Sequence, residues 1–297
     1  MRILLVGGSG QVGTALVEAA GRSVGIVRPP RGRLDLARPE TLPAALAAAP
    51  DVIVNAAAYT AVDAAEDDMQ TAFAINGSGP GRLASLCAAR GIPIIHLSTD
   101  YVFDGLKQGA YVESDLPNPM SVYGRSKWDG EEAVRRVQPQ HIILRTSWVY
   151  GVHGRNFVKA ILRRAATHKE LHVVNDQYGC PTAAADVAGG ILTILRQMEE
   201  GREVPWGTYH LAGADATSWF ELAKAAVALA APVTGRTPDV LPIATAVYPA
   251  RARRPANAIL DCRRISQAFG IRAAGWRERL APIVEGMLVD MQDAAVQ

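Results

Sequence analysis

The chain opens with Arg2-Ile3-Leu4-Leu5-Val6-Gly7-Gly8-Ser9-Gly10-Gln11-Val12-Gly13, a short apolar run that stops at closely spaced glycines. The next segment, Ala15-Leu16-Val17-Glu18-Ala19, has the apolar and small residues typical of a helix. This order of strand, turn and helix, with the spacing G-x-x-G-x-x-G, predicts the first unit of a dinucleotide-binding sheet.

The glycines of this turn have separate expected roles. Gly7 permits a tight turn, Gly10 lets the backbone approach a pyrophosphate, and Gly13 allows the helix to pack closely on the sheet. The helix begins near Gln11 and Val12, so its amides and the positive end of its dipole would face the phosphates. We therefore expect these five residues to bind the cofactor.

The second strand, predicted at 23–27, ends in Arg28-Pro29-Pro30-Arg31. It lacks the acidic residue that would accept hydrogen bonds from an adenosine ribose. Arg28 or Arg31 would instead hold a 2′-phosphate, unless both are merely solvated loop charges. The sequence therefore favours NADPH, with NADH as the alternative. Asp35 and Leu36 follow a third approach of the chain to the sheet, and we expect them beside the adenine.

Apolar runs alternate with Ala-rich helical stretches along the first half of the chain. The runs lie at 3–6, 24–27, 52–55, 92–98 and 142–146, and the helical stretches at 41–49, 72–89 and 126–136. Such alternation predicts an α/β fold with a doubly wound, parallel, Rossmann-type sheet. Continuous apolar strands indicate burial on both faces, and the carboxyl ends of parallel strands share one edge of the sheet.

The length of 297 residues exceeds that of a typical single-core domain. We expect a nucleotide-binding domain at 1–150 and a smaller, mainly substrate-binding domain at 151–297, where alternation weakens and Pro/Gly-rich connectors appear. Residues 171–199 are expected to pack back on the first domain, through a helix predicted at 183–198.

Charge and cysteine content exclude several classes of protein. The 31 basic and 29 acidic residues are nearly balanced, so nothing drives the chain toward nucleic acid or a membrane surface. Cys87, Cys180 and Cys262 have neither metal-ligand nor redox spacing. No basic leader and no apolar run of about 18 residues is evident. We therefore expect a soluble protein of the reducing cytoplasm.

The chemistry is indicated by Ser98-Thr99-Asp100-Tyr101-Val102-Phe103 and by Tyr123-Gly124-Arg125-Ser126-Lys127. Tyr123 and Lys127 are spaced i, i+4, so a helix places them on one face, close enough for the ammonium to favour ionisation of the phenol. The hydroxyl of Thr99, at the end of a buried strand, would orient a substrate oxygen. The alternative is an exposed Tyr/Lys pair without chemistry, but the position after the strand favours carbonyl reduction with Tyr123 as the acid.

Five further segments are informative together: Asp51-Val52-Ile53-Val54-Asn55-Ala56-Ala57-Ala58, Thr60-Ala61-Val62-Asp63, Arg145-Thr146-Ser147-Trp148-Val149-Tyr150, Asn175-Asp176-Gln177-Tyr178-Gly179 with Pro181-Thr182, and Arg254-Pro255-Ala256-Asn257. With them the chain resembles, nearly from end to end, the extended short-chain dehydrogenase/reductase family, and within it the dTDP-4-dehydrorhamnose reductases. In that family the cofactor delivers hydride to C4 of a keto-deoxysugar nucleotide, and a tyrosine donates the proton to give dTDP-L-rhamnose.

The resemblance implies a role for each matching residue. Tyr123 is the proton donor, Lys127 holds the nicotinamide ribose and lowers the tyrosine pKa, and Thr99 completes the catalytic triad. The segment Ala58-Tyr59-Thr60 lines the cofactor. The residues implied to contact the dTDP-sugar substrate are Thr99, Asp100, Trp148, Arg254 and Asn257, where Trp148 faces the sugar unless it packs in the core, and Arg254 and Asn257 bind the diphosphate or nucleotide.

The chain departs from metal-carrying members of that family at two positions. Those members have glutamates just after the third glycine and after the Pro-Thr segment, where this chain has Ala15 and Ala185. Without the carboxylates we expect no metal site. Because the ion bridges subunits in such members, a homodimer of this chain would not be linked by metal.

Two other functions stay open at this point. The triad sets the chemistry but not the sugar, so the chain could reduce another nucleotide-linked 4-keto-6-deoxy sugar. Some family relatives are instead non-catalytic regulatory subunits of methionine adenosyltransferase that bind a dinucleotide and a partner protein. The intact set of Thr99, Tyr123 and Lys127 argues against that role.

Overall fold

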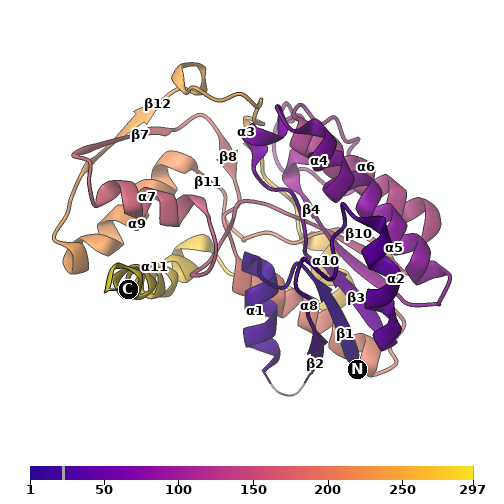
Figure 1. Ribbon diagram of the computed structural model, residues 1–297. Coiled ribbons are helices and arrows are strands. Elements are labelled where there is room, and N and C mark those ends of the chain that lie inside the picture. Colours follow the sequence, from indigo (N-terminus) through magenta and orange to yellow (C-terminus); the bar gives the residue numbers. More distant parts are fainter. Residues whose placement is uncertain (22–23, 297) are drawn as a thin grey trace.

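The computed structural model describes residues 1–21 and 24–296. Six parallel strands form its central sheet in the order β10-β5-β4-β3-β1-β2. Their bounds are β1 Arg2–Val6, β2 Gly25–Val27, β3 Val52–Asn55, β4 Ile94–Thr99, β5 His141–Thr146 and β10 Gly207–His210. Figure 1 shows this sheet with helices on both of its sides. The predicted doubly wound parallel sheet is confirmed, while residue 23 of the second predicted strand lies outside the described residues.

The strand order reverses between β1 and β3, because the chain first moves outward to β2 and then crosses back. Gly7 lies at this point with a φ of 81°, a conformation that favours glycine. A Cβ atom on Gly7 would also lie 2.5 Å from the backbone nitrogen of Ala57. Ligands of open α/β sheets bind in the crevice where the order reverses, so the glycine turn is placed for binding.

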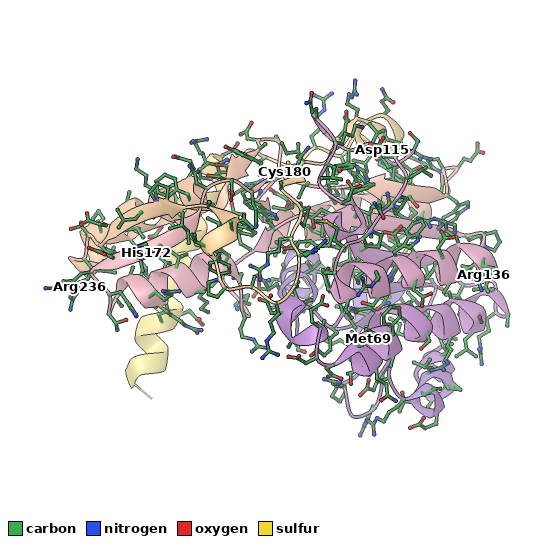
Figure 2. All side chains as sticks on the ribbon, turned by 90° about the horizontal axis from the view of Figure 1, so that it is seen from above. Met69, Asp115, Arg136, His172, Cys180 and Arg236 are labelled. Atoms are coloured by element: carbon green, nitrogen blue, oxygen red, sulfur yellow. The ribbon has the colours of Figure 1, made fainter. Side chains whose placement is uncertain are left out.

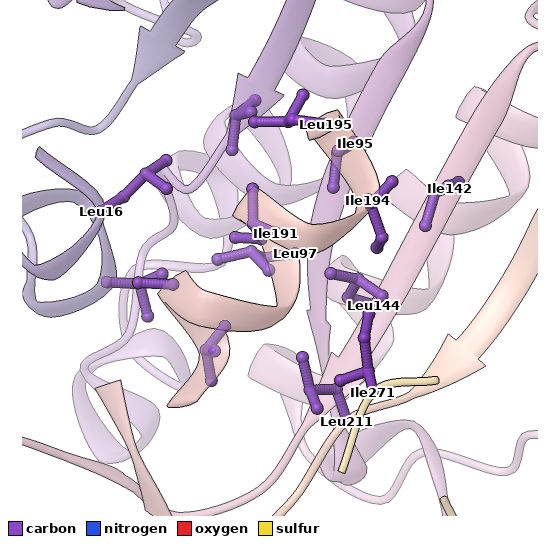
Figure 3. Close-up of a cluster of buried hydrophobic side chains, with 14 of the residues drawn as sticks. Leu16, Ile95, Leu97, Ile142, Leu144, Ile191, Ile194, Leu195, Leu211 and Ile271 are labelled. Atoms are coloured by element: carbon purple, nitrogen blue, oxygen red, sulfur yellow. The ribbon is translucent and has the colours of Figure 1, made fainter. Parts of the chain in front are cut away.

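Each face of the sheet is covered by its own helical layer. Helices α1 Gln11–Ala20 and α8 Ala184–Glu199 cover one face, and α5 Gly79–Ala88 and α6 Val122–Val137 cover the other. Figure 3 shows the first of these cores, where Ile191 and Ile194 of α8 meet strand residues such as Leu144. Burial on both faces explains why the strands are continuous apolar runs.

Strand β10 corrects the sequence prediction, which placed its residues among substrate-binding material. Gly207–His210 pairs in parallel with β5 and forms one edge of the sheet. Its four residues, Gly-Thr-Tyr-His, include no aliphatic side chain. An edge strand has only one neighbour to pair with, and so short a polar run carries no strand signal of its own.

Two predicted helices are interrupted. The stretch 41–49 contains only a short helix, α2 Leu42–Ala45, between two 3-10 turns at Pro39–Thr41 and Leu46–Ala48. The stretch 72–89 begins within α4 Met69–Phe73 and passes through a π-helical turn at Ala74–Ser78 before α5. By contrast, α6 begins four residues before the predicted start, because the Ser121 hydroxyl caps it by accepting from the amide of Gly124 at 3.1 Å.

The second part of the molecule contains α7 Phe157–Ala165, α9 Trp219–Thr234 and α11 Trp276–Val296, packed together around buried Trp276. A two-stranded sheet of β7 Glu170–Val174 and β12 Asp239–Ile243 lies beside them. Figure 2 shows His172 and Arg236 in this part, well away from Met69 and Arg136 of the larger part. The remaining elements are α3 Val62–Ala65, α10 Arg263–Phe269, β6 Val149–Tyr150, β8 Tyr178–Gly179, β9 Thr182–Ala183, β11 Thr217–Ser218 and β13 Asn257–Ala258.

The chain returns to the large sheet after entering the second part. Helix α8 packs on α1 and the sheet, and α10 contributes Ile265 and Phe269 to the same core. Strand β7 Glu170–Val174 overlaps the start of the stretch 171–199 that we expected to pack back, and it pairs with β12 of the second part. None of the helices within 1–21 and 24–296 is long and apolar enough to cross a membrane.

Candidate active site

Helix α6 presents Tyr123 and Lys127 on one face, toward the end of strand β4. Thr99 is the last residue of β4, and its hydroxyl, which donates to the Asp100 carboxylate at 2.9 Å, lies beside the Tyr123 phenol. The ammonium of Lys127 is buried and donates to the carbonyl of Leu97 at 2.6 Å. The structure therefore brings the three predicted catalytic residues together at the carboxyl edge of the sheet.

The proton affinities of this group differ from the sequence expectation. Burial raises the pKa of Tyr123 to about 12, although the hydrogen bond from Thr99 opposes this shift. Burial lowers the pKa of Lys127 to about 8, against the attraction of Glu131. Lys127 is not among the groups that shift the pKa of Tyr123 in this structure, where its ammonium donates to Leu97, so its effect on the phenol stays a proposal. At neutral pH the phenol carries its proton, as a proton donor must.

Asp100 is a buried carboxylate that contacts this group through Thr99. Its carboxylate accepts from the hydroxyls of Thr99 at 2.9 Å and Ser147 at 3.0 Å, and only 2% of the residue is exposed. Burial raises the pKa of Asp100 to about 7, although both hydroxyls oppose the shift. The structure thus places Asp100 in contact with the triad, where its protonation state would respond near neutral pH.

The glycine turn has the expected form. A Cβ atom on Gly13 would lie 2.3 Å from the carbonyl oxygen of Gly7, so the start of α1 packs against the turn only because Gly13 has no side chain. Gly10 begins α1 as its N-terminal cap residue, and Val12 is buried in the core. Gln11 also donates across to the carbonyl of Val149 at 3.4 Å. The arrangement leaves a cradle of backbone amides that fits a dinucleotide pyrophosphate.

The arginines after β2 lie in different environments. A Cβ atom on Gly8 would lie 2.9 Å from Cβ of Arg28, so Arg28 adjoins the glycine turn. Arg31 instead donates to Asp35 at 3.1 Å, and its side chain is 73% exposed. Asp35 and Leu36 lie in a loop, with Asp35 paired to Arg31 and Leu36 buried under the sheet. Of the two candidates for a 2′-phosphate, Arg28 is the better placed.

Asn76 is a buried residue of this region that the sequence analysis missed. Its side chain exchanges hydrogen bonds with the backbone of Tyr59, accepting at 2.8 Å and donating at 3.0 Å, and it also donates to Ser126 at 3.0 Å. It thereby holds the predicted cofactor segment Ala58-Tyr59-Thr60 against the catalytic helix. Asn76 lies in the π-helical turn, and a polar residue before Gly77 in an Ala-rich helix was the available signal.

Trp148 is held by aromatic packing. Its ring stacks on that of Trp219, with centroids 3.4 Å apart and planes 7° from parallel. Trp219 is in turn fixed by a hydrogen bond to Gln177 at 3.2 Å. Trp148 also has a φ of 47°, a strained conformation for a bulky residue. It remains partly exposed, so packing occupies one ring face while the expected sugar contact stays a proposal.

The two residues expected to bind the nucleotide have different partners. Arg254 donates to the carboxylate of Asp63 at 2.6 Å, and its Nε atom is buried without a partner among the described residues. Asn257 donates to the carbonyls of Lys107 and Gly109, both at 2.7 Å, and its oxygen accepts from the amide of Ile259. Arg254 keeps donors for a ligand, and the Asn257 side chain holds a loop through its own hydrogen bonds, so the expected contact of Asn257 with the nucleotide stays a proposal.

Ala15 and Ala185, which stand where metal-carrying members of the family have glutamates, both lie on helices of the described structure. Ala15 is partly buried on α1, and Ala185 is exposed on α8. Within the part of the chain that the structure describes, no group of three or more His, Cys, Asp or Glu could hold a metal ion.

Comparison with known proteins identifies the family of this chain. The family model described as RmlD substrate binding domain matches residues 1–289. A dTDP-4-dehydrorhamnose reductase of Sinorhizobium fredii is 46% identical over 296 residues, covering 99% of this chain and 100% of the relative. A dTDP-4-dehydrorhamnose reductase of Burkholderia thailandensis is 41% identical and covers 97% of this chain and 99% of its own length.

The chain is also similar in fold and sequence to solved structures of dTDP-4-dehydrorhamnose reductases. A dTDP-4-dehydrorhamnose reductase from Clostridium acetobutylicum is 33% identical, with a TM-score of 0.89 over 96% of this chain and 99% of that chain. One from Bacillus anthracis, solved in complex with NADP, is 32% identical, with a TM-score of 0.87 over 95% of this chain and 98% of that chain. Our chain therefore belongs to the family of dTDP-4-dehydrorhamnose reductases.

Proposed function

We propose that this protein reduces the C4 keto group of dTDP-4-dehydro-β-L-rhamnose with NADPH to give dTDP-β-L-rhamnose. The observation that carries the proposal is the convergence of Thr99, Tyr123 and Lys127 at the carboxyl edge of the sheet, beside the glycine turn. Family membership supports the substrate, and the Bacillus anthracis relative in complex with NADP supports the cofactor.

The residues present fit a bound dinucleotide. Gly7 packs so closely on Ala57, and Gly13 on Gly7, that a side chain at either glycine would distort the turn whose amides face the pyrophosphate. Arg28 is placed beside this turn to meet a 2′-phosphate, which favours NADPH, with NADH as the alternative. When bound, the nicotinamide supplies the hydride for C4.

The chain's own residues handle the proton and the orientation. Tyr123 is protonated at neutral pH and donates its proton to the C4 oxygen as negative charge develops there. Thr99 lies beside the same phenol and helps to orient the substrate oxygen. Lys127 stabilises the tyrosinate that is left and holds the nicotinamide ribose, which requires its ammonium to exchange the Leu97 carbonyl for these partners.

The two parts of the molecule bind different ligands. Residues 1–150, together with α8 and β10, bind the dinucleotide, and the rest of 151–297 binds the nucleotide sugar. Arg254 binds the diphosphate, and Trp148 and Asp100 contact the sugar. If the chain forms a homodimer, Ala15 and Ala185 provide no carboxylate for a bridging metal.

The test is NADPH oxidation with dTDP-4-dehydro-β-L-rhamnose as substrate, followed by NMR of the sugar product. We expect the L-rhamnose configuration at C4. A C4 epimer, or turnover only with another nucleotide-linked 4-keto-6-deoxy sugar, would reject the substrate assignment. Tight NADPH binding without any oxidation would reject the reductase itself and favour a regulatory subunit.

A further inference from the structure

Glu131 is a buried acidic residue that the proposed reaction does not use. It follows Lys127 by four residues on α6, so Tyr123, Lys127 and Glu131 form one stripe along the same face of the helix. This stripe meets three consecutive residues of β4: Thr99 lies beside Tyr123, the carbonyl of Leu97 accepts from Lys127, and the hydroxyl of Ser98 donates to Glu131 at 2.5 Å. Glu131 is completely buried.

The carboxylate of Glu131 is held from three sides. Arg145 of β5, which is 2% exposed, donates to it through Nε at 2.9 Å and through Nη2 at 2.7 Å. Arg135 donates from the next turn of α6 at 2.5 Å. Although burial acts to raise it, these two arginines and the Ser98 hydroxyl hold the pKa of Glu131 below its usual value. Glu131 is therefore negatively charged at neutral and alkaline pH.

The other groups around Lys127 do not provide such a charge. His96, on β4, is buried and neutral, because burial and the charge of Lys127 lower its pKa well below 6.5. Arg145 on β5 and Arg135 on α6 are cations, and Tyr123 is a neutral phenol. Asn76, in the π-helical turn against α6, does not titrate. Glu131 is the group that raises the pKa of Lys127 against the effect of burial.

We propose that Glu131 is a positioning residue for Lys127: it fastens α6 to β4 and β5 and supplies a buried negative charge one helical turn from the lysine ammonium. The proposal rests on the proposed function only in assigning Lys127 to the nicotinamide ribose. A buried ion pair often contributes little net stability compared with apolar residues. Its place one turn from Lys127 gives this one a role in the site.

Two substitutions break the same buried pair but have opposite electrostatic effects on Lys127. Glu131→Gln removes the negative charge, so Lys127 should lose its proton at a lower pH. Arg145→Met removes a positive charge and leaves Glu131 in place, so Lys127 should not lose its proton earlier. Both variants should lower the thermal midpoint. A purely structural role for Glu131 predicts that the two variants behave alike.

The readouts are the pH profile of kcat/KM and the affinity for NADPH between pH 6 and 10, measured by NADPH fluorescence. For Glu131→Gln we expect the alkaline limb of both profiles to move down by about one pH unit, the effect of losing a nearby opposite charge. Glu131→Asp should restore most of the shift. Glu132→Gln, on the same helix but paired with Arg135 at the partly exposed surface, is the matched control and should leave both profiles unchanged.

An alkaline limb that stays in place in folded Glu131→Gln, or that moves equally in Arg145→Met, overturns the proposal. If Glu131→Gln does not fold, Arg135→Gln replaces it, since Arg135 is 26% exposed. Removing that cation should move the limb to higher pH, and no movement overturns the proposal. The NADPH titration does not require the dTDP-sugar, so failure of the proposed reaction and failure of the Glu131 role give different results.

Discussion

The guanidinium of Arg254 donates to the carboxylate of Asp63 at 2.6 Å, across 191 positions of the chain. Asp63 also accepts from the amide of Ala252 at 3.1 Å. Helix α3 follows the cofactor segment 58–60, so this contact joins the loop that carries Arg254 to the larger part of the molecule. It sets the direction of the guanidinium that we assign to the diphosphate.

Arg254→Ala should raise KM for the nucleotide sugar by about 10-fold to 100-fold, the effect of losing a charged hydrogen-bond donor. The kcat and the affinity for NADPH should change little. Arg251→Ala is the control, because Arg251 lies in the same loop, pairs with Asp67 and is 68% exposed. Equal KM values for both variants in steady-state kinetics would remove Arg254 from the diphosphate site.

Tyr123→Phe should lower kcat by about 10²-fold to 10⁴-fold, the usual contribution of acid catalysis. The affinity for NADPH should remain, because the substitution removes one hydroxyl and keeps the ring that packs on Tyr101 with centroids 5.5 Å apart. Single-turnover kinetics and NADPH fluorescence make the comparison. Undiminished turnover would show that another group is the acid.

Asp100→Asn should alter how stability depends on pH. The pKa of Asp100 is about 7 in the folded chain against an ordinary 3.8, so the folded state keeps a proton that the unfolded state releases between these values. This stabilisation is complete below about pH 4 and is lost as the pH rises through 7.

The thermal midpoint of Asp100→Asn should therefore rise relative to the unmodified protein between pH 4 and 7, by a few degrees. Above pH 7 the difference should stay constant. Asp104→Asn is the control of opposite sign, because the amide of Leu106 lowers the pKa of Asp104. A midpoint difference for Asp100→Asn that does not vary with pH would contradict the assigned pKa.

Gly13→Ala should weaken NADPH binding by at least about 10-fold, because the added methyl would meet the carbonyl of Gly7 and distort the turn. Gly189→Ala on α8 is the matched control, since a Cβ atom there would meet nothing within 4 Å. It should leave the affinity unchanged and stabilise the helix by roughly 0.5–1 kcal/mol. Unaltered affinity in Gly13→Ala would place the cofactor elsewhere.

Exhaustive EDTA treatment should leave activity unchanged, because Ala15 and Ala185 supply no oxygen ligands and, within the described residues, no cluster of metal-ligating side chains occurs. The measurement is the rate of NADPH oxidation before and after treatment. A collapse of that rate that magnesium restores would show a metal site of another composition.

Local patterns in the chain were sufficient to predict the sheet and to place the proposed catalytic residues at its edge. Strand β3 has the predicted bounds, 52–55, because a fully buried strand is a continuous apolar run bounded by turn residues. Tyr123 and Lys127 were found because helical spacing alone places them on one face. Strand β10 and the π-helical turn were missed, since the first has no apolar pattern and the second interrupts one.

By itself, the sequence determined the parallel sheet, the glycine turn and the three residues that we propose as catalytic, because each depends on residues close together in the chain or on the shared edge of parallel strands. Only the tertiary structure decided which charged side chains meet. Glu131 pairs with Arg145 of β5, and Arg254 pairs with Asp63, which lies 191 positions earlier in the chain. The tertiary structure also decided that burial, more than the neighbouring lysine, sets the pKa of Tyr123. Burial and long-range pairing depend on how the elements pack together, and that packing cannot be inferred from residue spacing along the chain.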